Sequence, residues 1–93
     1  MSTPVVLIEI LTAPGCVYCE TAKVRVANTV QKVRDDLPDL TVKIIDLADH
    51  PEIGFKYGVL STPAIAINGR LEFIGVPKEE DLKVRIMKAS GRS

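Results

Sequence analysis

The chain has 93 residues, of which 46% are hydrophobic and 26% charged, so we expect one small globular domain over residues 1–93, with residues 90–93 as a frayed tail. Twelve basic and twelve acidic residues give a formal net charge of zero, which argues against nucleic acid as a partner and against a polybasic membrane-binding patch. No apolar run approaches the ~20 residues of a membrane-spanning helix, and the N-terminus lacks the positive charge of a signal peptide, so we expect a cytoplasmic protein.

The first half of the chain predicts a strand followed by a long helix. The apolar run over residues 5–11 is continuous rather than alternating, which is typical of a strand buried on both faces. Beyond the breaker at residues 12–15, apolar residues spaced four, four, three and four apart form one helical stripe: Ala22, Val26, Val30, Val33 and Leu37. Pro38 is expected to end this helix.

A second strand and a short helix follow. Residues 41–47 are again largely apolar and predict a strand. The next segment has the pattern of a helix start, with Asp49 as the capping residue, and Gly58 is expected to end that helix. Among the aromatic residues here, we interpret Phe55 and Tyr57 as core residues, and His50 as a surface residue.

The last part of the chain predicts a hairpin and a helix. Residues 64–67 and 71–74 are apolar, and Asn68-Gly69 between them is a strong signal for a two-residue hairpin turn. Pro77 is expected to open a final helix that Gly91 ends. The predicted order is therefore β-α-β-α-β-β-α, an α/β fold with a mixed four-stranded sheet and helices on both faces.

The two cysteines, Cys16 and Cys19, lie where the first helix begins. Cys19 continues the buried stripe, and Cys16 lies one turn earlier, where the chain emerges from the preceding loop. Residues three apart in a helical turn have Cα atoms roughly 5 to 5.5 Å apart, which is compatible with a disulfide. A helix N-terminus also stabilises an anion such as a thiolate. A reversible disulfide is the reading that these features favour.

Two other readings of the cysteine pair stay open. It could form half of a zinc site, although zinc usually takes four ligands and the other strong ligand, His50, lies at a different helix start. It could also be two inert buried thiols. No phosphate-binding glycine loop is present, and we expect no cofactor and no metal.

Several motifs together resemble the thioredoxin superfamily. They are a strand, Cys-Val-Tyr-Cys opening a helix, Lys56-Tyr57-Gly58-Val59, Thr62-Pro63 at a strand start, Asn68-Gly69 and Gly75. The resemblance covers nearly the whole chain. Its length and the Tyr before the second cysteine resemble glutaredoxins and small glutaredoxin-like thioredoxins. The resemblance implies a thioredoxin fold.

The resemblance also implies roles for individual residues. Cys16 resembles the nucleophile, Cys19 the resolving thiol, and Pro63 the cis-proline that faces them, so that the backbone of Thr62 could pair with a substrate segment. Tyr18 would form a semi-exposed lip of the site, and Gly15 keeps bulk away from the attacking sulfur.

Three positions depart from the patterns of these families. Pro14-Gly15 stands beside Cys16 where thioredoxins carry a Trp. Ile10 stands where thioredoxins carry a buried Asp that moves the proton of the second thiol. Residues 75–79 stand where glutaredoxins usually hold glutathione with a Gly-Gly and a small-residue-Asp motif.

We therefore expect a dithiol–disulfide oxidoreductase that reduces protein disulfides through a reversible Cys16–Cys19 bond and contributes to cell redox homeostasis. Its partners would be disulfide-containing proteins and an upstream reductase or glutathione, and the protein would be a monomer. The alternatives are a glutathione-dependent glutaredoxin and, from a different class, a non-catalytic thiol- or metal-binding module.

Overall fold

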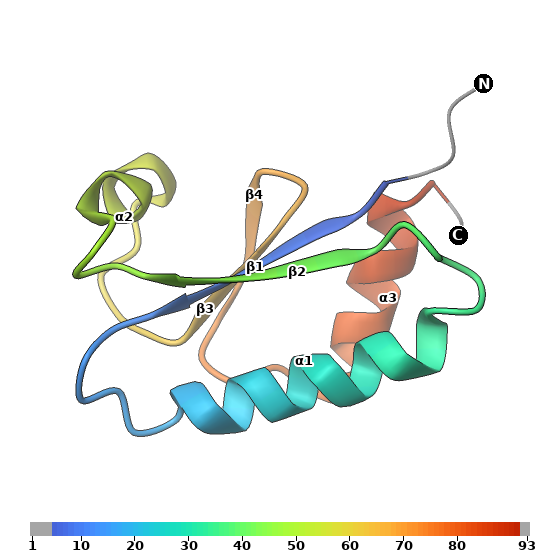
Figure 1. The fold of residues 1–93 in the computed structure, drawn as a ribbon, viewed down its shortest axis with the longest axis horizontal. Helices are drawn as coiled ribbons and strands as arrows, with labels where there is room; N and C mark the ends of the chain where they lie inside the picture. The colour runs from blue at the N-terminus through green and yellow to red at the C-terminus, as the bar shows by residue number, and fades with distance from the viewer. Residues whose placement is uncertain (1–4, 92–93) are drawn as a thin grey trace.

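The computed structural model describes residues 5–91, and its helices and strands follow the predicted order. Figure 1 shows their arrangement. The elements are β1 (Leu7–Thr12), α1 (Cys19–Val33), β2 (Thr41–Asp46), α2 (Pro51–Tyr57), β3 (Ala64–Ile67), β4 (Arg70–Ile74) and α3 (Glu79–Ala89).

The four strands form one mixed sheet in the order β2-β1-β3-β4. Strand β1 is parallel to β2, with Leu7 beside Thr41, and antiparallel to β3. Strands β3 and β4 form the predicted hairpin, whose two turn residues both have positive φ angles, 50° at Asn68 and 78° at Gly69. Because this two-residue turn is complete at Gly69, β4 begins at Arg70, one residue earlier than predicted.

Helices cover both faces of the sheet, as the fold class predicts. Helices α1 and α3 lie on one face and α2 lies on the other (Figure 1). The larger core, between α1, α3 and the sheet, includes Ile8, Ile10, Val26, Val30, Ile65, Ile67, Leu82 and Ile86. A smaller cluster under α2 contains Leu11, Val59 and Ala64. Apolar residues on both sides of β1 are therefore buried, which explains its continuous apolar run.

Helix α1 ends at Val33, five residues before the predicted stop at Pro38. The next residues form a turn in which the Leu37 N–H still donates to the Val33 carbonyl, so Leu37 remains in the core. The apolar spacing in the sequence therefore extends four residues beyond the last residue of α1, from Val33 to Leu37. Strand β2 lies at the edge of the sheet, and its Thr41, Lys43 and Ile44 are exposed.

The prediction that Asp49 caps α2 is wrong. His50 occupies the N-cap position without a side-chain hydrogen bond, because Asp49 belongs to a turn in which its N–H and that of His50 both donate to the Asp46 carbonyl. The His50 side chain is exposed, as expected. Gly58 ends α2 in a left-handed conformation with a φ of 67°, which confirms the predicted stop.

The assignment of Phe55 to the core is also wrong, because its side chain is 86% exposed. Helix α3 begins at Glu79, two residues after Pro77, since Lys78 still has extended backbone. At the other end, Ser90 is buried and its hydroxyl donates to the Met87 carbonyl, whereas residues 92–93 of the expected tail lie outside the described residues.

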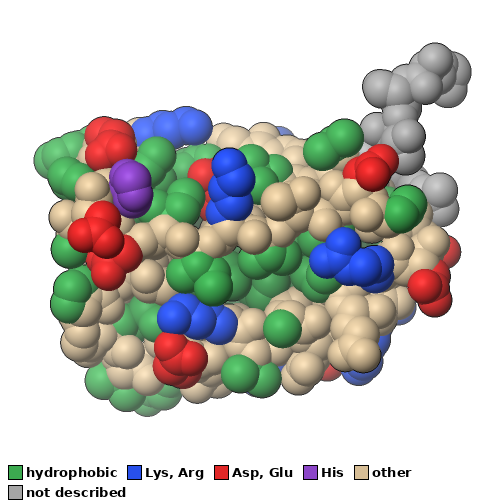
Figure 2. Space-filling view, viewed as in Figure 1, with side chains coloured by type: hydrophobic (Ala, Val, Ile, Leu, Met, Phe, Trp, Pro, Cys, Tyr) green, Lys and Arg blue, Asp and Glu red, His purple; other side chains and the backbone are tan. Residues whose placement is uncertain are grey.

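Over residues 5–91, none of the helices is long and apolar enough to cross a membrane. Figure 2 shows basic and acidic side chains interspersed with hydrophobic ones on the visible face.

Candidate active site

The cysteine pair lies at the end of the sheet where β1 stops. After Thr12 the chain turns, with the Cys16 N–H donating to the Ala13 carbonyl at 3.2 Å, and α1 begins at Cys19. Cys16 therefore lies in the loop before the helix rather than inside its first turn. The first helical hydrogen bond runs from the Ala22 N–H to the Tyr18 carbonyl. The earlier N–H groups of a helix have no partner within it, and they favour negative charge at this end.

Cys16 and Cys19 form a disulfide with a Cα–Cα separation of 5.5 Å, in agreement with the separation expected from their spacing. The two residues differ in accessibility, because Cys19 is only 5% exposed and Cys16 is half-buried. Cys16 is therefore the more accessible residue of the pair.

The peptide bond between Thr62 and Pro63 is cis. Leu11 pairs with Ala64 in the antiparallel register, so the next position places Pro63 beside Thr12, where the cysteine loop begins. The Gly75 N–H donates to the Pro63 carbonyl at 2.7 Å, which brings the end of β4 to the same place. The fold thus assembles residues separated by about half of the chain at one end of the sheet.

Large apolar side chains are exposed around this end of the molecule. Val17 and Tyr18, between the cysteines, are 82% and 64% exposed, and Leu60, two residues before Thr62, is fully exposed. Tyr18 was predicted from the sequence as part of the site, whereas Val17 and Leu60 were not. The only available signal for Leu60 was its closeness in sequence to the Thr62-Pro63 motif.

A polar pair joins α2 to the sheet. The Tyr57 hydroxyl donates to the Glu9 Oε1 at 2.5 Å, and Glu9 is only 8% exposed. Burial raises the pKa of Tyr57 to about 12, and the hydrogen bond to Glu9 and its negative charge act in the same direction. The alternation of side chains along β1 places Glu9 on the face opposite Ile10, but its partner was not predicted, because a separation of 48 positions carries no pairing signal.

Two basic residues follow the cysteines on α1, and both have partners. The Lys23 Nζ lies 2.8 Å from Glu20 Oε1, and the Arg25 Nη1 donates to the Pro77 carbonyl at 2.6 Å. The second contact links α1 to the segment between β4 and α3.

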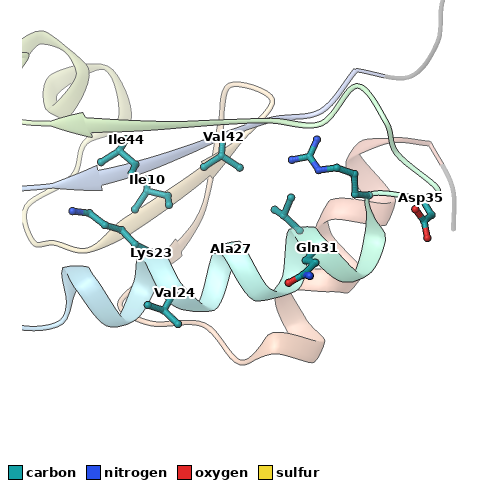
Figure 3. A pocket seen from close by; sticks show the side chains of 10 residues that line it. Ile10, Lys23, Val24, Ala27, Gln31, Asp35, Val42 and Ile44 are labelled. Carbon is teal, nitrogen blue, oxygen red and sulfur yellow. The ribbon is translucent and has the colours of Figure 1, made fainter.

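A hollow in the described part of the chain lies away from the disulfide. It has a volume of about 740 Å³ and lies between α1 and β2, where Figure 3 shows Val24, Val42 and Ile44 along its walls. Neither cysteine lines it. The disulfide therefore lies outside this hollow.

Comparison with known proteins agrees with this geometry. A family model for the thioredoxin domain matches residues 1–86. The chain is 38% identical over 84 residues to a thioredoxin of Methanocaldococcus jannaschii, a match that covers 89% of this chain and 94% of that protein. It is 41% identical over 78 residues to a probable thioredoxin of Methanothermobacter thermautotrophicus, covering 84% of this chain and 88% of that one.

Solved structures give the same result. A protein disulfide oxidoreductase of Aeropyrum pernix is 36% identical with a TM-score of 0.75, and the match covers 97% of this chain but 40% of that one. Our chain thus spans about two fifths of the length of that protein. A mutant thioredoxin of Halobacterium salinarum, 21% identical with a TM-score of 0.72, shares the fold; that match covers 91% of this chain and 74% of that one. The chain belongs to the thioredoxin family.

Proposed function

We propose that the protein reduces disulfide bonds in other proteins, with Cys16 as the attacking thiol and Cys19 as the resolving thiol. The observation that carries this proposal is the Cys16–Cys19 disulfide, with Cys16 half-buried and Cys19 buried, at the end of the sheet where the cis Thr62-Pro63 bond precedes β3. The exposed surface around it suits a large substrate better than a small molecule, which usually binds in a concave pocket.

The reaction starts from the reduced pair. The Cys16 thiolate attacks one sulfur of a substrate disulfide, so that a mixed disulfide forms and the other substrate sulfur leaves as a thiolate. Cys19 then loses its proton and attacks the Cys16 sulfur, which forms the Cys16–Cys19 bond and releases the second substrate thiolate. Two electrons pass from the cysteine pair to the substrate, and the released thiolates take up two protons, one from Cys19 and one that Cys16 gave to solvent when its thiolate formed.

The partial exposure of Cys16 supports its role as the first nucleophile. The Cys16 sulfur must meet a substrate sulfur in line with the S–S bond of the substrate, and this requires access from solvent. The buried position of Cys19 supports the second role, because a buried Cys19 can reach the neighbouring Cys16 sulfur but not a substrate sulfur that approaches from solvent. The neighbouring helix N-terminus stabilises the thiolate form.

The proton of Cys19 needs an acceptor that the sheet does not supply at position 10. Ile10 is 1% exposed and apolar, and the Glu9 carboxylate accepts a hydrogen bond from Tyr57 on the face covered by α2. We therefore assign the proton to water or to the departing substrate thiolate.

The backbone of Thr62 is the proposed docking position for an extended segment of the substrate, and we call it the docking strand together with β3, which follows it. Thr62 is partly exposed and immediately precedes β3, and an extended substrate segment could add to it by main-chain hydrogen bonds. A separate reductant must reset the disulfide after each cycle. We place this cycle in a reducing compartment, the cytoplasm.

An insulin reduction assay tests the proposal. The parent protein is expected to accelerate the precipitation of insulin chains in the presence of dithiothreitol, and Cys16→Ser to abolish the acceleration. Cys19→Ser keeps the first nucleophile, so it should accumulate a mixed disulfide with the substrate, whereas Cys16→Ser should not. Equal insulin reduction by Cys16→Ser and the parent would overturn the proposal. Replacing dithiothreitol by glutathione with glutathione reductase, or by a thioredoxin reductase, identifies the reductant.

A further inference from the structure

We infer that Arg25 is a positioning residue for protein substrates, which holds the segment between β4 and α3 against Pro63. The inference rests on the proposed function and extends it to a residue that touches neither sulfur.

Two hydrogen bonds fix this segment. At its start, the Gly75 N–H donates to the Pro63 carbonyl at 2.7 Å, and two residues later the Pro77 carbonyl accepts the Arg25 Nη1 at 2.6 Å. Arg25 lies on α1, six residues after Cys19, which corresponds to a rise of about 9 Å along the helix. One run of bonded contacts therefore leads from the dithiol helix through Arg25, Pro77 and Gly75 to Pro63.

The Pro77 carbonyl lies in a segment that belongs to neither strand nor helix, between the end of β4 at Ile74 and the start of α3 at Glu79. The Pro77 ring is buried, and its carbonyl needs a partner. The bond from a guanidinium is charge-assisted and stronger than a bond between neutral groups.

The consequence concerns the spacing between the disulfide and the docking strand. A substrate segment on Thr62 must present its own disulfide in line with Cys16, and small errors in the placement of reacting groups lower rates strongly. Arg25 links α1, which carries Cys19, to the segment that bonds Pro63. A small disulfide that does not use Thr62 has no need of this spacing.

The test compares two substrates in three variants. Arg25→Met removes the donors but keeps an apolar stem, and Arg25→Lys restores one charged donor. Arg85→Met is the matched control, since Arg85 pairs with Glu72 on the surface and its loss changes the net charge equally. For each variant, KM and kcat are measured with insulin and with hydroxyethyl disulfide, together with the unfolding midpoint and the hydrogen exchange rate of the Gly75 amide.

Arg25→Met is expected to lower kcat/KM for insulin by up to about tenfold, to leave kinetics with hydroxyethyl disulfide unchanged, and to speed exchange at Gly75. Arg25→Lys should fall between Arg25→Met and the parent, and Arg85→Met should match the parent. Unchanged insulin kinetics in Arg25→Met, or equal losses with both substrates, would overturn the inference. If the parent itself failed to reduce insulin, the proposed function would fail, and exchange at Gly75 would still test whether Arg25 holds the segment.

Discussion

The hydrogen bond between Tyr57 and Glu9 offers a sharp test of how α2 is fixed to the sheet. Tyr57→Phe removes the hydroxyl that donates to the Glu9 carboxylate at 2.5 Å and leaves that carboxylate, which is 8% exposed, without this donor. Hydrogen bonds to charged groups contribute about 1.5 to 3 kcal/mol. Because Tyr57 is only half-buried, water can partly replace it, and we expect a loss near the lower end, about 1.5 kcal/mol.

A double variant separates the contribution of the Tyr57–Glu9 hydrogen bond from the other effects of the two substitutions. In Glu9→Leu with Tyr57→Phe, both polar partners are replaced by apolar side chains, so no buried charge is left without a donor. The double variant should therefore be more stable than the sum of the two single changes predicts, with a coupling of about 1 kcal/mol. Tyr18→Phe is the matched control, because Tyr18 is 64% exposed and its substitution should cost under about 0.5 kcal/mol.

The measurement is guanidinium unfolding of the oxidised protein followed by far-UV circular dichroism. The free energies of the parent, the single variants, the double variant and the control are compared at one pH. If Tyr57→Phe were as neutral as Tyr18→Phe, or if the two single changes simply added, the structural role of this pair would be refuted.

Two further predictions concern pH and glycine. The pKa of Tyr57 is raised to about 12 in the folded state, so its contribution to stability is complete below the ordinary tyrosine pKa of about 10 and is lost as the pH rises through 12. Unfolding free energies over this range should therefore fall more steeply for the parent than for Tyr57→Phe, and equal slopes would contradict the assignment. Gly58→Ala should cost about 1 kcal/mol from its φ of 67° alone, since nothing lies within 4 Å of the added Cβ. Gly54→Ala, inside α2, should instead stabilise by about 0.5 to 1 kcal/mol, because Ala favours a helix more than Gly does and the added Cβ would lie 3.7 Å from Leu47, an ordinary contact distance. Thermal unfolding of both variants checks that the two substitutions change stability in opposite directions.

The parts of the fold that sequence could predict are those with local signals. The continuous apolar run of β1, the spaced stripe of α1 and the Asn68-Gly69 turn each reflect backbone geometry within a few residues. The cysteine pair belongs to the same class, because a separation of three residues sets the distance between the two Cα atoms. These features gave the order of elements and the candidate disulfide.

The wrong predictions for the α2 cap and for Phe55 have physical causes that local sequence patterns do not reveal. The N-cap of α2 is His50 rather than Asp49, because the N–H groups of Asp49 and His50 both donate to the Asp46 carbonyl and place Asp49 in the preceding turn. Phe55 is apolar but lies on the outer side of a short helix, and a seven-residue helix is too short for its apolar residues to show which side is buried.

Long-range contacts explain what sequence missed in the site. The bond from Tyr57 to Glu9 and the bond from Arg25 to Pro77 join residues 48 and 52 positions apart. Neither contact leaves a trace in spacing or composition, and both arise only when the sheet and helices come together.

The proposed function depends most on the interconversion of the Cys16–Cys19 pair in the folded protein. The direct measurement equilibrates the protein in dithiothreitol buffers of graded potential, alkylates the thiols, and counts them by mass spectrometry while circular dichroism reports the fold. We predict that both thiols appear together in one two-electron transition, within a monomeric species whose circular dichroism stays constant. A pair that stays oxidised until the protein unfolds, or thiols that appear one at a time, would contradict the account.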